Sequence, residues 1–119
     1  MAKILVVDDV ASELEMISRI LKNAGMEVVE ATDGEEAIAC IRESIPDVVI
    51  LDVIMPRMNG FEVIRELRGD RKTERLPVIF CSQKNTEIDK TWGAELGADA
   101  YVTKPFDPEQ LVDIVQRLL

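Results

Sequence analysis

The stretch Val48-Val49-Ile50-Leu51-Asp52 decides the fold, because four apolar residues in a row end in a single carboxylate. A continuous apolar run is typical of a strand that is buried on both faces, as in a parallel sheet covered by helices. In α/β proteins of this kind, ligands bind beyond the carboxyl ends of the strands. Asp52 is therefore predicted to stand at the edge of the sheet where chemistry takes place.

Three further apolar runs also end in polar residues. The run at residues 4–7 ends in Asp8 and Asp9, the run at 78–81 ends in Ser82, and the run at 100–103 ends in Lys104. Four strand ends thus carry three acids, one hydroxyl and one ammonium. This combination is what a magnesium-dependent site that accepts a phosphoryl group requires.

Strand and helix patterns alternate along the whole chain, with no linker or repeat between them. We expect strands at residues 3–8, 27–31, 47–52, 77–82 and 99–102, and helices at 11–24, 34–43, 59–68, 86–96 and 108–118. Five such units are too few for a closed eight-stranded barrel. The pattern predicts a single domain over residues 1–119 with a flavodoxin-like, doubly wound sheet of five parallel strands, order 2-1-3-4-5, and five helices.

Composition excludes several classes of function. The 119 residues carry a net charge of −9, which argues against a nucleic-acid surface, since phosphate binding needs clustered cations. No apolar stretch approaches the roughly 20 residues of a membrane span, and the amino terminus does not resemble a signal peptide, so a cytoplasmic location without membrane insertion is expected. The absence of histidine removes imidazole zinc sites and Ser-His hydrolase chemistry.

The predicted strand order brings the acids together. Strands one and three are neighbours in it, so Asp8, Asp9 and Asp52 should converge at one edge of the sheet. Three close carboxylates repel one another unless a cation lies between them, and oxygen ligands with room for water suit Mg²⁺. Asp9 is favoured as a direct ligand, with Asp8 binding directly or through water, and the backbone carbonyl of Ile54 could complete the coordination sphere.

One of these acids must be the nucleophile. Carboxylates can accept phosphoryl groups as acyl phosphates. Asp52 is the best candidate, because it is single and is flanked by the other two acids. Lys104 would neutralise oxygens of the incoming phosphoryl group, and Ser82 would donate a hydrogen bond to another oxygen.

The chain resembles the receiver domains of bacterial response regulators (the CheY-like family) over essentially its whole length. The matching segments are residues 6–9, residues 51–56 with Asn59-Gly60, Ser82, and residues 101–106. The resemblance implies that Asp52 takes its phosphoryl group from a sensor histidine kinase or a histidine phosphotransfer protein, while Asp8 and Asp9 hold Mg²⁺ and Lys104 contacts the phosphoryl group. It also implies a cis peptide bond between Lys104 and Pro105.

The same resemblance assigns a switching role to Ser82 and Tyr101. Phosphorylation would draw the Ser82 hydroxyl toward the new oxygens, and Tyr101 would turn into the space that the loop leaves. The surface of the fourth helix, fifth strand and fifth helix would then change shape for a downstream protein target. With no output domain expected within residues 1–119, signalling would pass through this surface.

Residues 87–98 are similar to the same stretch of twitching-motility regulators of the pilus chemosensory (PilH-like) type, which suggests motility or taxis signalling. Two interpretations of Trp92 remain open. It is either an exposed anchor for a partner or, with Ile88 and Leu96 at helical spacing, part of the face that packs the helix on the sheet.

Several alternatives share parts of this pattern. Within the family, the chain could be a phosphorelay shuttle or a phosphate sink without a direct motility target. A flavodoxin-like enzyme or cofactor binder would share the fold, but Asp8-Asp9 would repel a flavin phosphate. A phosphatase of the haloacid dehalogenase type wants a second acid two positions after the nucleophile, where this chain has Ile54. We therefore expect a signalling protein rather than an enzyme.

Overall fold

Five short apolar strands form the centre of the protein, described here for residues 1–119 from a computed structural model. The strands are β1 (Lys3–Val7), β2 (Glu27–Ala31), β3 (Val48–Leu51), β4 (Val78–Ser82) and β5 (Ala100–Thr103). All four neighbouring pairs are parallel, and the order is β2-β1-β3-β4-β5. The predicted flavodoxin-like sheet is confirmed. Each predicted strand lies within two residues of the observed one, as is normal for strand ends.

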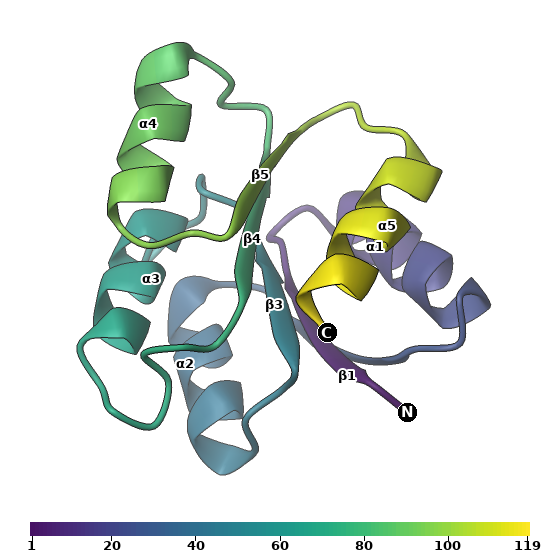
Figure 1. Ribbon diagram of the computed structural model, residues 1–119, viewed down its shortest axis with the longest axis horizontal. Helices are drawn as coiled ribbons and strands as arrows, with labels where there is room; N and C mark the ends of the chain where they lie inside the picture. The colour runs from purple at the N-terminus through teal and green to yellow at the C-terminus, as the bar shows by residue number, and fades with distance from the viewer.

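Five helices cover the two faces of this sheet. They are α1 (Ala11–Asn23), α2 (Gly34–Glu43), α3 (Gly60–Arg68), α4 (Glu87–Glu95) and α5 (Pro108–Leu118). Figure 1 shows α1 and α5 on one side of the sheet and α2, α3 and α4 on the other. None of the five combines the length and the apolar composition that crossing a bilayer demands.

The continuous apolar runs of the central strands fill two separate cores. Alternate residues of a strand point to opposite faces, so Val49 and Leu51 join the core under α2 and α3, while Val48 and Ile50 join the core under α1 and α5. All four of these side chains are buried. Burial on both faces holds β3 rigidly, and the residue that follows it is Asp52.

Side-chain caps fix where the helices begin. The side chains of Asn59 and Thr86 each accept a hydrogen bond from the backbone N–H of the third helical residue. In return, the carboxylates of Glu62 and Asp89 accept a hydrogen bond from the backbone N–H of the cap residue. These are capping boxes, which satisfy backbone N–H groups that the first turn leaves free. The two residues are therefore caps rather than the first helical residues that the sequence pattern predicted.

The packing of helix α4 decides between the two interpretations of Trp92. Ile88 and Trp92 were one possible packing face, but their side chains point outward, 81% and 46% exposed. The buried positions are Asp89 and Gly93. A Cβ at Gly93 would lie 3.1 Å from the Phe80 ring, so the missing side chain lets the helix backbone approach the sheet closely. The interpretation of Trp92 as a packing residue is wrong.

Candidate functional site

Two acids follow directly on neighbouring strands at the carboxyl edge of the sheet. Asp8 follows β1 and Asp52 follows β3, and the Asp52 N–H donates to the Val7 carbonyl at 3.1 Å. This continuation of the ladder places the two carboxylates side by side. Both residues are buried although both are charged, which requires a partner of opposite sign.

Lys104 is that partner. It follows β5, and its Nζ donates to Asp8 Oδ2 at 2.6 Å and to Asp52 Oδ2 at 2.9 Å. Its side chain is only 4% exposed. The backbone N–H of Lys104 donates to the Ser82 carbonyl at 2.9 Å, which ties the start of this segment to the end of β4. Lys104 is thus held at both ends, and the Lys104–Pro105 peptide bond that follows is cis.

Burial and ion pairing act in opposite directions on the pKa of Lys104 and on the pKa of Asp8. Burial would lower the pKa of Lys104, but the hydrogen bonds and charges of Asp8 and Asp52 outweigh it and hold the pKa above its ordinary value. Burial raises the pKa of Asp8, because loss of water costs more than its contacts with Lys104 and the Val10 N–H return. Lys104 therefore stays charged at neutral pH, where it can neutralise an anion.

The third carboxylate of the acidic group is that of Glu13 and not that of the expected Asp9. Oxygens of Asp8, Glu13 and Asp52 lie within 4.8 Å of one another. Carboxylate oxygens without nitrogen or sulfur donors are the chemistry that Mg²⁺ prefers, so the residues fit the predicted ion. Asp9 is exposed and lies outside this group of three, and its role as a ligand remains a prediction.

Glu13 does not follow a strand, so the pattern of polar residues at strand ends does not predict it. It stands in the first turn of α1, where an acid is ordinarily explained by the positive end of the helix dipole. A signal was nevertheless present, because α1 begins directly after the loop that carries Asp8. An acid in its first turn can fold back toward the same edge.

The loop after Asp52 is shaped around that residue. The second oxygen of Asp52, Oδ1, accepts a hydrogen bond from the Ile54 N–H at 3.2 Å. The Ile54 side chain is exposed. Behind the loop, a Cβ on Gly60 would lie 2.4 Å from the Asp52 carbonyl oxygen, so only glycine lets α3 begin at this point. The close approach of α3 thereby supports the backbone at Asp52.

Ser82 and Tyr101 both form hydrogen bonds with the backbone of Lys84. Ser82 is fully buried, and its Oγ accepts a hydrogen bond from the Lys84 N–H at 3.2 Å. The Tyr101 hydroxyl donates to the Lys84 carbonyl. The Lys84 side chain in turn pairs with Asp89 of α4 at 2.9 Å. The β4–α4 loop therefore connects the end of β4 to both α4 and β5.

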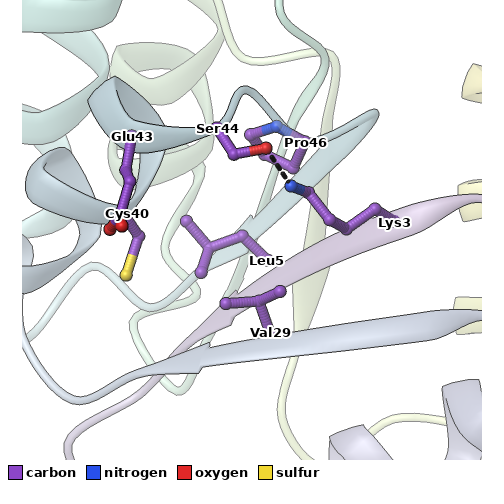
Figure 2. Close-up of a pocket in the computed structure, with 7 residues that line it drawn as sticks. All are labelled: Lys3, Leu5, Val29, Cys40, Glu43, Ser44 and Pro46. Carbon is purple, nitrogen blue, oxygen red and sulfur yellow. Dashed lines mark hydrogen bonds between the residues drawn. The ribbon is translucent and has the colours of Figure 1, made fainter.

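A cavity of about 210 Å³ lies at the other end of the strands. Figure 2 shows Lys3 of β1 reaching across to Ser44, with Leu5, Val29 and Cys40 around the hollow. These residues belong to the amino-terminal part of the sheet and to α2. The cavity is therefore separate from the acidic edge, and none of the predicted site residues lines it.

Comparisons with known proteins agree with this geometry. The family model of the response regulator receiver domain matches residues 4–116. PilH of Pseudomonas aeruginosa is 40% identical over 119 residues, which cover all of this chain and 98% of that protein. The alkaline phosphatase synthesis transcriptional regulatory protein PhoP of Bacillus subtilis is 40% identical over 117 residues, but the match covers only 48% of its length.

Solved structures give the same result. The chemotaxis response regulator CheY4 of Vibrio cholerae superimposes with a TM-score of 0.93 at 39% identity, covering 100% of this chain and 99% of that one. The receiver domain of a Francisella response regulator gives 0.93 at 31% identity, covering 99% and 96% of the two chains. With the family model spanning nearly the whole sequence, this chain belongs to the response regulator receiver domain family.

Proposed function

We propose that this chain is a phosphorylation switch in which Asp52 accepts a phosphoryl group from a sensor histidine kinase or a histidine phosphotransfer protein. The observation that carries the proposal is the contact of one buried ammonium, that of Lys104, with two buried carboxylates at 2.6 and 2.9 Å. A lysine held there is placed to neutralise a group that arrives on Asp52.

In the proposed reaction, an oxygen of Asp52 attacks the phosphorus of a phosphohistidine. The O–P bond forms as the N–P bond breaks, and the imidazole nitrogen keeps the electron pair of that bond. Lys104 pairs with one phosphoryl oxygen, and the Ser82 hydroxyl donates to another. When bound by Asp8, Asp9, Asp52 and the Ile54 carbonyl, Mg²⁺ would supply further charge neutralisation.

The hydrogen bonds of Lys84 offer a route from this reaction to the surface. Ser82 now accepts from the Lys84 N–H, and Tyr101 donates to the Lys84 carbonyl. Movement of the Ser82 hydroxyl toward a phosphoryl group would break the first bond and shift the loop. Tyr101 would then lose its acceptor and be free to turn inward. Ser82 is the last residue of β4 and Tyr101 lies in β5, so the β4–α4 loop is the part that would move.

The surface that would respond is formed by α4, β5 and α5. On α4 it contains a hollow of about 250 Å³ lined by Ile88 and Trp92 together with Glu87, Thr91 and Glu95. Exposed large apolar side chains with a polar rim are typical of protein interfaces. We infer that a downstream protein binds here. The likeness to PilH and CheY4 supports a role in motility or taxis signalling.

Acetyl phosphate with Mg²⁺ tests the proposed acceptor. We expect one added phosphoryl group by mass spectrometry, labile to hydroxylamine as an acyl phosphate should be. Asp52→Asn should remain unmodified, whereas Asp113→Asn, which removes an exposed carboxylate from α5, should be labelled like the wild type. Equal labelling of wild type and Asp52→Asn would overturn the assignment.

A further inference from the structure

Glu13 has a contact that neither the helix dipole nor the expected ligand set explains. Its Oε2 lies 3.2 Å from Lys104 Nζ, and its side chain is 25% exposed. Lys104 therefore has three carboxylate partners. Two of them, Asp8 and Asp52, are predicted site residues, and the third comes from the first turn of α1.

The charges of this group do not balance. Ionised Asp8, Glu13 and Asp52 contribute three negative charges, and Lys104 contributes one positive charge. The remainder is two negative charges in a place where Asp8 and Lys104 are almost fully removed from water. Like charges so close are costly in a medium of reduced polarity, and one divalent cation would neutralise them.

Glu13 is better placed for such a cation than the exposed Asp9 is in this structure. Its carboxylate lies within 4.8 Å of the carboxylate oxygens of both Asp8 and Asp52. Being partly exposed, it can also turn without unpacking the core. A residue in this position can take part in binding the ion directly or through water, since Mg²⁺ usually keeps several waters.

We propose that Glu13 is a positioning residue of the phosphoacceptor site, whose carboxylate holds Lys104 beside Asp52 and increases the affinity of the site for a divalent cation. This inference rests on the proposed function. It adds a residue to the predicted set of Asp8, Asp9, Asp52 and Ile54. It also gives the first turn of α1 a role in the site beyond packing.

The effect of Glu13 on cation affinity can be measured without phosphorylation by titrating the protein with Mn²⁺. Bound Mn²⁺ is detected as a loss of the electron paramagnetic resonance signal of the free ion. Mn²⁺ accepts the same oxygen ligands as Mg²⁺. We expect Glu13→Gln, which keeps the shape of the side chain, to weaken Mn²⁺ binding about tenfold or more. The matched control is Glu15→Gln on the same helix, whose exposed carboxylate pairs with Arg19, and it should bind like the wild type.

The outcomes separate this inference from the proposed function. If Glu13→Gln binds Mn²⁺ as tightly as the wild type while Asp8→Asn binds it weakly, Glu13 has no role and the site itself remains. If the wild type does not bind Mn²⁺, the proposed magnesium site is wrong as well. Urea unfolding of each variant without metal verifies that the variant is folded. A weaker affinity then reflects the changed side chain and not a loss of structure.

Discussion

Lys104 Nζ and Asp52 Oδ2 lie 2.9 Å apart and are both buried, although 52 positions of sequence separate the two residues. Removing one partner of such a buried pair leaves the other charge uncompensated in the interior. We predict that Lys104→Met, which leaves Asp8 and Asp52 without their cation, lowers the free energy of unfolding by about 3 kcal/mol in urea titrations without metal.

Added Mg²⁺ should return part of that loss, because it can replace the missing positive charge. Lys90→Met is the matched control. Its ammonium is partly exposed and lies 4.0 Å from Glu87, so the expected change is below about 1 kcal/mol. Equal stability of Lys104→Met and Lys90→Met would mean that the buried contacts of Lys104 do not support the fold.

The start of α3 leads to a second prediction. A Cβ at Gly60 would lie 2.4 Å from the backbone oxygen of Asp52, and backbone cannot move aside as a flexible side chain can. We expect Gly60→Ala to lower the free energy of unfolding by about 2 kcal/mol and to reduce labelling by acetyl phosphate, since Asp52 must shift.

Gly69→Ala is the control for this substitution. At that position the nearest atom, the Arg65 carbonyl oxygen, would lie 3.5 Å from the new Cβ, which is an ordinary contact. The residue has φ of −86°, so alanine adopts its conformation without strain. Chemical denaturation of both variants should show a loss at Gly60 alone.

The positions of Asp8, Asp52 and Lys104 could be predicted from sequence because a simple rule governs them. Parallel strands that are apolar throughout all present their carboxyl ends at one edge, so the residue after each run must stand there. Glu13 follows no such rule. Its carboxylate reaches the site from a helix, and the direction of a helical side chain depends on how that helix packs.

The exposed face of α4 could not be predicted for a related reason. Hydrophobic spacing leaves open whether Ile88 and Trp92 form the packing face, and the residues that α4 buries are Asp89 and Gly93 instead. The deciding contact is the approach of Gly93 to the ring of Phe80, which a pattern of apolar residues cannot reveal. Polar bonds from Thr86 and Lys84 to Asp89 also compensate for burying that acid.

This orientation of α4 gives a third prediction, with two isoleucines as a matched pair. Ile88 is 81% exposed, so Ile88→Ala should change the free energy of unfolding by no more than about 0.5 kcal/mol. Ile64 of α3 is fully buried, and Ile64→Ala should cost about 3 kcal/mol. A comparable loss for both variants in urea would mean that Ile88 packs inward after all.

Tyr101, the single tyrosine of the chain, allows the loop contact to be tested by titration. Burial raises the pKa of Tyr101 from 10.0 to about 12, and the negative charge of Asp89 acts in the same direction. We expect the ultraviolet absorbance of tyrosinate to develop near pH 12 in the folded protein and near pH 10 in urea. A folded-state midpoint near pH 10 would contradict the half-buried placement of the phenol.

The sign of the linked stability change follows from that shift. Because the folded protein holds the phenolic proton more tightly than the unfolded chain does, the contribution of Tyr101 to stability is complete below pH 10. It declines as the pH rises from 10 and is lost as the pH passes the folded-state pKa near 12. Tyr101→Phe keeps the ring but has no ionisable proton. Urea unfolding at pH 9 and pH 11 should therefore show a smaller loss for Tyr101→Phe than for the wild type.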